Sequence, residues 1–187
     1  MRIISGKNKG KKLILPSDKS TRPLKDLTKE SIFNIIHHSK KFELKIKDSL
    51  VLDLFSGVGS FGLECLSRDA SKVTFVENYI KVLPVLKKNI NNLGFNDQSQ
   101  IIEKDIFNQL NFVILKEKYD LIFIDPPYKE NKLKILIEKI SLNKVLKKFG
   151  IIIIHRHKNE NDEFNDNFEI IDRKIYGISK IIFGRLK

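Results

Sequence analysis

The chain has 187 residues, 41% hydrophobic and 31% charged, and 35 basic against 23 acidic residues give a formal net charge of +12. This composition excludes a disordered or fibrous protein, and the length suits one domain rather than two. No apolar run approaches the roughly 20 residues that cross a bilayer, and no secretion signal is visible, so we expect a cytoplasmic protein without a membrane partner. The single cysteine, Cys65, predicts neither a disulfide nor a metal site, and we expect it in a helix core.

The first 22 residues concentrate basic side chains around Gly6, Gly10 and Pro16, which predicts a short basic hairpin or arm. We take this arm as residues 1–25 and expect it to contact nucleic-acid phosphates, because clustered Lys and Arg release counterions from them. The candidate contacts are Arg2, Lys7, Lys9, Lys11, Lys12 and Arg22. Elsewhere, a genomic bias towards Lys, Ile and Asn explains the positive charge equally well.

Residues 26–187 follow the pattern of an α/β domain. Apolar residues at helical spacing predict a first helix over 26–38, and from residue 50 short apolar runs alternate with amphipathic stretches, as in a parallel sheet covered by helices. The expected strands are 50–55, 72–77, 99–103, 119–125 and 150–155, and the expected helices are 59–68, 79–93, 106–115 and 131–147.

The C-terminal part differs from this alternation. Residues 168–176 and 178–185 flank Gly177 and predict a hairpin, so the sheet should finish with antiparallel strands. Before the hairpin, we expect His155, Arg156 and His157 at a solvated strand end, with a phosphate contact as the alternative, and 158–167 as a solvated loop.

The most informative segment is 51–62, a strand that runs into a glycine-rich turn and a helix. Gly57, Gly59 and Gly62 match G-x-G-x-x-G, which alone suggests a dinucleotide site. Asp53 would oppose a pyrophosphate there and instead suits a positively charged ligand. S-adenosylmethionine (SAM) carries an ammonium and a sulfonium and no phosphate, so we predict that Asp53 holds its ammonium directly or through water. The candidate cofactor residues of this segment are Asp53, Phe55, Ser56, Gly57 and Gly59.

Two further acids follow the next strands. Glu77 lies where an open parallel sheet places a residue beside an adenosine ribose, and its carboxylate can accept both hydroxyls. Asp105, with the backbone of Ile106, is placed to read the adenine edge, but it could equally cap the helix 106–115. Asn78 is a further candidate for the cofactor site.

The fourth strand ends in Asp125-Pro126-Pro127-Tyr128. Two consecutive prolines fix φ and remove two N–H donors, which leaves a turn rich in acceptors. An exocyclic amino group of a nucleobase is a poor nucleophile, because its lone pair is delocalised into the ring. If Asp125 and the carbonyl of Pro126 each accept one N–H, the lone pair is directed at the methyl group, and Asp125 can take the departing proton.

Tyr128 completes this candidate catalytic set of Asp125, Pro126, Pro127 and Tyr128. Its ring could stack on a base rotated out of a helix or loop. Core packing is the alternative for Tyr128, and a simple turn after a strand is the alternative for the whole tetrapeptide.

Together with the arm, these motifs resemble the RsmD-type methyltransferases, which modify the exocyclic N2 of a guanine in bacterial small-subunit ribosomal RNA. The resemblance spans nearly the whole chain. It rests on residues 1–6, 9–13, 22–26 and 30–34, the glycine loop, the tetrapeptide and Tyr176-Gly177. The chain departs from the family pattern at Leu24, Lys25 and Leu27, where threonines and an arginine are usual, and at Val58, where a small polar residue is frequent.

The resemblance implies a class I SAM-dependent methyltransferase fold, Rossmann-like, with a seven-stranded, mostly parallel sheet whose last strand is antiparallel. It also implies methylation of the family target, guanine 966 of 16S rRNA, on the assembled small ribosomal subunit. We expect a monomer. The residues alone indicate only an amino-group methyltransferase acting on nucleic acid, so an adenine-N6 or cytosine-N4 DNA methyltransferase is the main rival. A nicotinamide-binding oxidoreductase and a non-catalytic RNA-binding domain are more distant alternatives.

Overall fold

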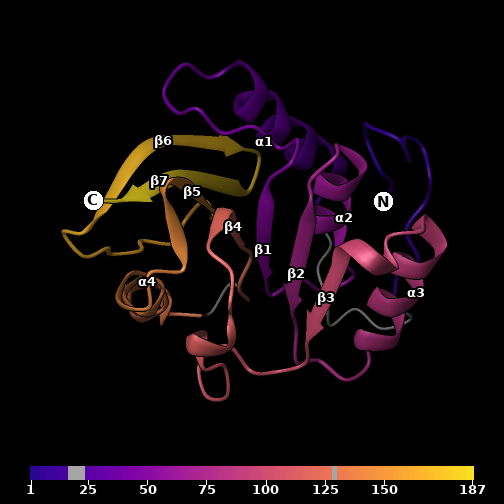
Figure 1. Cartoon of the computed structure of the whole chain (residues 1–187). Helices are drawn as coiled ribbons and strands as arrows, with labels where there is room; N and C mark the ends of the chain where they lie inside the picture. The colour runs from indigo at the N-terminus through magenta and orange to yellow at the C-terminus, as the bar shows by residue number, and fades with distance from the viewer. Residues whose placement is uncertain (17–23, 128–129) are drawn as a thin grey trace.

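The computed structural model describes residues 1–16, 24–127 and 130–187, and within these ranges seven strands form one sheet in the order β3-β2-β1-β4-β5-β7-β6 (Figure 1). β1 pairs in parallel with β2 and β4, β2 with β3, and β4 with β5, whereas β7 is antiparallel to both β5 and β6. The predicted mostly parallel sheet with an antiparallel last strand is therefore confirmed. The strands are β1 (Leu50–Leu54), β2 (Lys72–Val76), β3 (Ser99–Ile102), β4 (Tyr119–Ile124), β5 (Leu146–His157), β6 (Phe168–Tyr176) and β7 (Ser179–Leu186).

Helices cover both faces of the sheet. The α-helices are α1 (Asp26–His38), α2 (Ser60–Ser67), α3 (Leu83–Leu93) and α4 (Leu133–Leu142), and the short 3₁₀ helices are η1 (Asn96–Gln98) and η2 (Phe112–Ile114). Apolar residues of the arm, α1, α2 and α3 pack on one face, and those of 106–115 and α4 pack on the other. Cys65 is fully buried in α2, as predicted. None of the helices in the described ranges has the length and apolar character to span a membrane.

The predicted helix over 106–115 is wrong. The backbone N–H groups of Phe107 and Asn108 donate to the Asp105 carboxylate at 3.0 and 2.7 Å, which makes a capped turn. Asn111 then accepts from the N–H of Val113 at 3.0 Å and starts the separate short helix η2. Since Asx side chains compete with the helical backbone for its donors, two caps six residues apart leave no room for a continuous helix.

Three other boundaries also differ from the prediction. The helix expected over 131–147 spans only Leu133–Leu142, because Lys144 has a φ of +51° that reverses the chain, and β5 begins at Leu146 instead of residue 150. The helix expected from residue 79 begins at Leu83, with Pro84 in its first turn, where a proline costs no hydrogen bond.

The N-terminal arm is a hairpin, as predicted. Arg2 pairs with Lys12 in an antiparallel bridge, and the N–H of Ile3 donates to the carbonyl of Lys11 at 2.9 Å. The side chains of Ile3 and Leu13 are buried in the same cluster as α1, α2 and α3. The lysines of the hairpin are therefore exposed, while its Ile3 and Leu13 side chains belong to the core.

Candidate active site

The glycine loop and the Asp125-Pro126-Pro127 turn lie side by side at one edge of the sheet. The loop follows β1 and the turn follows β4, and these strands are parallel neighbours. From β1 the chain continues to β2 on one side, and from β4 to β5 on the other, so the strand order reverses between them. Such a reversal is where open α/β sheets place a ligand crevice.

The glycine loop has three residues at positive φ: Phe55 at +60°, Gly57 at +54° and Gly59 at +81°. A Cβ on Gly59 would lie 2.6 Å from the Leu86 side chain, so this position must be glycine for the packing of α2 against α3. A Cβ on Gly57 would meet nothing within 4 Å. The open side of Gly57 is thus the side from which a ligand can approach the backbone.

Asp53 has a buried carboxyl group, 1% exposed, and only one of its two oxygens accepts a hydrogen bond. Its Oδ2 accepts from the N–H of Gly62 at 2.9 Å, and its Oδ1 is buried without a hydrogen-bond partner in the described part of the chain. Burial raises the pKa of Asp53 to about 8, with a contribution from the negative charges of Asp125 and Glu77. An unpaired buried acceptor is costly, and a cation or its water shell would satisfy it, so the position fits the predicted ammonium.

Glu77 ties the end of β2 to the glycine loop. Its Oε2 accepts from the N–H of Gly57 at 2.7 Å, and its Oε1 accepts from the N–H groups of Asn78 and Tyr79, each at 2.9 Å. A carboxylate has about four acceptor positions, and three are occupied. This geometry has room for one ribose hydroxyl without rearrangement, whereas both hydroxyls were expected.

Asp105 acts as the cap of a turn, which is one of the two roles that its position allows. Its Oδ2 also accepts from the side-chain amide of Asn78 at 2.9 Å, and this bond links the ends of β2 and β3. The side chain of Ile106 is buried, so only its backbone could meet a ligand. The adenine contacts of Asp105, Ile106 and Asn78 stay predictions.

Asp125 is held at the end of β4, with its side chain 17% exposed. Its N–H donates to the carbonyl of Leu54 at 3.3 Å, and its Oδ1 lies 2.8 Å from Nδ1 of His155. Pro126 is buried and Pro127 is exposed. Tyr128 lies outside the described residues, so its stacking role stays a prediction.

The expectation of a solvated strand end at His155 and Arg156 is wrong, since these side chains are 4% and 1% exposed. β7 pairs with β5 as far as His157 and covers this end of the strand. Arg156 donates to the carbonyls of Pro127 and Glu130 at 3.3 and 2.8 Å, and to the carboxylate of Asp162 at 2.9 Å. Sequence reasoning missed both residues because their partners after β4 come within reach only through the parallel pairing of β4 with β5, and β7 then covers the strand end.

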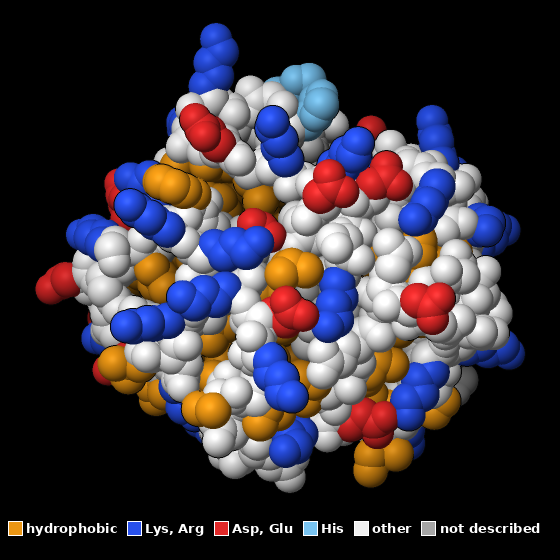
Figure 2. All heavy atoms as spheres, in the orientation of Figure 1, with side chains coloured by type: hydrophobic (Ala, Val, Ile, Leu, Met, Phe, Trp, Pro, Cys, Tyr) orange, Lys and Arg blue, Asp and Glu red, His pale blue; other side chains and the backbone are white. Residues whose placement is uncertain are grey.

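The candidate RNA contacts of the arm are exposed in the described residues. Lys9, Lys11 and Lys12 are open to solvent, Lys7 lies 5.0 Å above the ring of Phe95, and Arg2 is paired with Asp26 at 3.7 Å. Arg22 lies outside the described residues. Figure 2 shows Lys and Arg side chains spread over the whole visible face among acidic and apolar ones, so positive charge is not confined to the arm.

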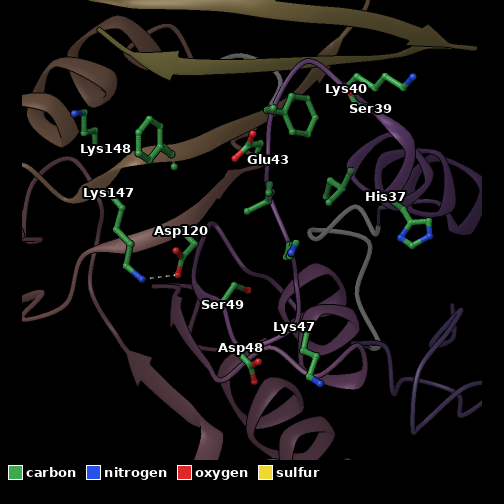
Figure 3. A pocket seen from close by; sticks show the side chains of 16 residues that line it. His37, Ser39, Lys40, Glu43, Lys47, Asp48, Ser49, Asp120, Lys147 and Lys148 are labelled. Atoms are coloured by element: carbon green, nitrogen blue, oxygen red, sulfur yellow. Dashed lines mark hydrogen bonds and ion pairs between the residues drawn. The ribbon is translucent and has the colours of Figure 1, made fainter.

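A pocket of about 1000 Å³ lies at the opposite edge of the sheet, away from the predicted site (Figure 3). Its lining includes Ser49, Asp120 and Gly150, which are at the amino ends of β1, β4 and β5. Lys147 is paired there with Asp120 at 2.8 Å. None of the predicted catalytic or cofactor residues lines this pocket.

The sheet order, the reversed β7 and the glycine loop beside Asp125 define the class I SAM-dependent methyltransferase fold. An RNA methyltransferase from Salinibacter ruber, solved in complex with S-adenosyl-L-homocysteine, has this fold with a TM-score of 0.63 at 11% identity, over 87% of this chain and 92% of that one. The solved structure of Escherichia coli yhhF matches more fully, with a TM-score of 0.81 at 26% identity over 100% of this chain and 98% of that one.

The model of the family "Conserved hypothetical protein 95" matches residues 1–185, so the chain belongs to this family, the RsmD family of methyltransferases. Ribosomal RNA small subunit methyltransferase D of Haemophilus influenzae is 32% identical over 95% of this chain and 90% of its own length. The enzyme of the same name from Buchnera aphidicola is 34% identical over 92% and 86%.

Proposed function

We propose that this protein methylates the exocyclic N2 of a guanine in 16S ribosomal RNA, with SAM as the methyl donor. The observation that carries this proposal is the arrangement of Asp125, Pro126 and Pro127 beside a glycine loop with an unsatisfied, buried Asp53. Relatives named ribosomal RNA small subunit methyltransferase D support the rRNA substrate. By the same resemblance, the substrate is guanine 966 in the assembled small subunit. We also propose that the enzyme is a cytoplasmic monomer.

In this proposal, one set of residues binds the cofactor and another binds the nucleobase. Asp53 and the backbone at Gly57 bind the amino-acid end of SAM, and Glu77 receives a ribose hydroxyl. When bound, SAM supplies an electrophilic methyl group on a sulfonium. Oδ2 of Asp125, which no described residue occupies, accepts one N–H of the guanine amino group, and the carbonyl of Pro126 accepts the other. These two acceptors hold the nitrogen with its lone pair pointing towards the methyl group.

The amino nitrogen loses one proton when the new N–C bond forms. Asp125 is the nearest group in this arrangement that can receive the proton, because its side chain is partly exposed and already accepts the N–H. We further propose that Lys7, Lys9, Lys11, Lys12 and Arg2 contact RNA phosphates, which would orient the substrate without reading its sequence.

The test is to incubate the protein with isotopically labelled SAM and small ribosomal subunits that lack the modification, and to identify the labelled nucleoside after digestion. Label in N2-methylguanosine supports the proposal. Label in N6-methyladenosine, or only in control DNA, assigns the protein to the rival class.

The matched variants are Asp125→Asn and Asp97→Asn, the latter at an exposed position in η1. Asn at position 125 turns one acceptor into a donor, so we expect methyl transfer to fall by about 100-fold or more while SAM affinity changes little. Asp97→Asn should retain wild-type activity. An Asp125→Asn variant as active as the wild type would remove Asp125 from the mechanism.

A further inference from the structure

We infer that His155 is a positioning residue that fixes the orientation of the Asp125 carboxylate. This inference rests on the proposed function, because it concerns the group that receives the amino N–H. The observation is a chain of side-chain contacts that joins Oδ1 of Asp125, directly after β4, to the imidazole of His155 on β5 and to Oγ of Ser179 on β7. The two distances are 2.8 Å from Nδ1 to Oδ1 and 2.9 Å from Nε2 to Oγ.

The sheet places these groups on one face. β4 and β5 are parallel with Ile124 opposite Ile154, so the next residues, Asp125 and His155, are neighbours. Phe123 and Ile153 come two residues before them and pack in the core on the side of α1, α2 and α3. Since strand side chains alternate between faces, Asp125 and His155 point to that side as well, as does Asp53 two residues after Val51.

The chemistry of the three groups fixes their roles. A carboxylate only accepts, so Nδ1 of His155 must carry the hydrogen that it shares with Oδ1. The Ser179 hydroxyl completes the hydrogen bond at Nε2, because a hydroxyl can donate to a neutral ring or accept from a protonated one. Burial of His155 and Ser179, which are 4% and 5% exposed, keeps water from replacing either bond.

One oxygen of Asp125 is thereby occupied and the other is left for the substrate. Without the bond from Nδ1, the carboxylate could rotate about its Cβ–Cγ bond, and Oδ2 would spend less time where the amino group needs an acceptor. Small errors in the placement of a reacting group reduce catalysis by large factors. The expected effect is therefore on kcat, and binding of SAM at the glycine loop should be unaffected.

Two substitutions distinguish the hydrogen bond made by Nδ1 of His155 from the one made by Nε2. The amide nitrogen of Asn is as many bonds from Cα as Nδ1, so His155→Asn keeps a donor for Asp125 and removes the hydrogen bond with Ser179. The amide of Gln extends as far as Nε2, so His155→Gln keeps a hydrogen bond with Ser179 and removes the donor for Asp125. We expect His155→Gln to lower kcat by about 10-fold or more with KM for the small subunit within threefold. His155→Asn should stay within about threefold of the wild-type kcat.

A role in packing alone predicts the opposite order, because Asn is smaller and leaves the larger cavity. Thermal unfolding and SAM titration of both variants report on the fold, and His37→Gln, exposed at the end of α1, is the control substitution. Equal kcat values for the two variants, or a larger loss in His155→Asn, would overturn the inference. If the wild type itself does not methylate rRNA, the proposed function fails instead, so the two failures are distinguishable.

Discussion

Asp53 and Glu77 are predicted cofactor ligands, and both carboxyls also accept hydrogen bonds from the backbone of the loop and helix that follow β1. Asp53 accepts from Gly62 at the start of α2, and Glu77 accepts from Gly57 in the middle of the loop. The two carboxyls differ in how many hydrogen bonds they accept. Glu77 has three donors, whereas Oδ1 of Asp53 has none in the described residues, so the cost of burial falls mainly on Asp53.

Asp53 gives the cofactor-free protein a specific pH dependence. Its pKa is raised from 3.8 to about 8 in the folded chain, chiefly by burial, so the folded state holds a proton that the unfolded state has lost. The stability that this proton contributes is complete below pH 4 and is lost as the pH rises towards 8. The free energy of unfolding should therefore fall over this interval in the wild type relative to Asp53→Asn, which mimics the neutral acid. Urea unfolding at several pH values measures the difference, and parallel curves would contradict the prediction.

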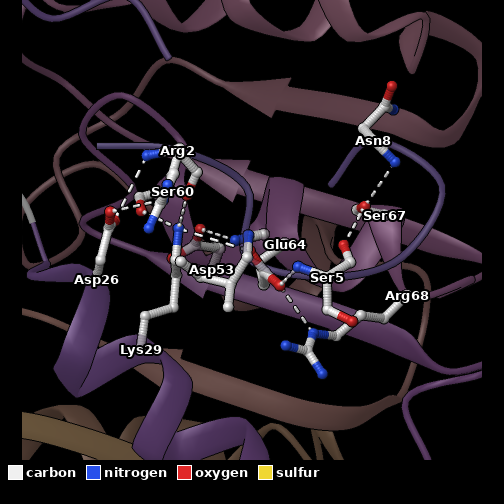
Figure 4. A network of polar contacts seen from close by, with 12 residues as sticks. Arg2, Ser5, Asn8, Asp26, Lys29, Asp53, Ser60, Glu64, Ser67 and Arg68 are labelled. Carbon is white, nitrogen blue, oxygen red and sulfur yellow. Dashed lines mark hydrogen bonds and ion pairs between the residues drawn. The ribbon is translucent and has the colours of Figure 1, made fainter. Parts of the chain in front are cut away.

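At the scale of elements, α2 joins the arm to the cofactor loop. Glu64 on α2 is fully buried and accepts from the N–H groups of Ile4 and Ser5 at 2.7 and 3.0 Å, and from Nε of Arg68 at 2.8 Å (Figure 4). Lys29 of α1 lies 3.6 Å from the same carboxylate. Burial lowers the pKa of Lys29, and Glu64 partly offsets this effect. The arm, α1 and α2 therefore share one buried charge network.

Removal of the Glu64 carboxylate should lower the stability of the whole domain, and not only the docking of the arm. Glu64→Ala leaves Lys29 buried without its carboxylate partner, and breaking such a pair costs about 3–5 kcal/mol. The exposed Glu30 of α1 is the matched control, and Glu30→Ala should change stability by less than about 0.5 kcal/mol. Chemical unfolding of the two variants gives both values. Similar stabilities would show that the network is not needed for docking of the arm.

Predicted elements are accurate where the signals that form them lie close together in the sequence and act alone. α1 was predicted with its observed bounds, and β1, β2 and β4 to within one residue, because buried apolar runs and helical spacing are local signals. The segment 106–115 was misread because Asp105 and Asn111 cap short turns within an apolar stretch that has helical spacing. The start of β5 was missed because Leu146 joins the sheet only through its pairing with Tyr119.

At the scale of the molecule, the net charge of +12 is spread widely, and the arm holds only part of it. The arm is nevertheless distinctive, since it is fixed to the core through Ile3, Leu13 and Glu64 while its lysines stay exposed. A fixed basic hairpin can position RNA relative to the catalytic edge. The tip of the hairpin docks on the C-terminal ends of α2 and α3, where the N–H of Lys7 donates to the carbonyl of Ser67 and the side chain of Asn8 donates to that of Leu93.

The proposed role of the arm in RNA binding predicts how the affinity depends on salt. Replacing Lys7, Lys9, Lys11 and Lys12 with Ala should lower the slope of log affinity against log salt by about 0.7 for each phosphate that is no longer neutralised. The matched set Lys45, Lys47, Lys118 and Lys148, exposed lysines outside the arm, should leave the slope close to that of the wild type. Affinity measurements for a 16S rRNA fragment at several salt concentrations compare the two sets. Equal slopes would show that the charge of the arm has no special role.

The class of fold and the composition of the glycine loop and of the Asp125-Pro126-Pro127 turn follow from local sequence signals alone. The reason is physical: the order of buried strands, the glycines at positive φ and the two consecutive prolines act within a few residues of themselves. Only the tertiary structure decided what supports Asp125. His155 and Arg156 reach the turn because β5 pairs in parallel with β4, and Ser179 reaches His155 because β7 returns antiparallel along β5. A contact between residues 30 positions apart, such as His155 with Asp125, depends on strand register, which no local pattern encodes.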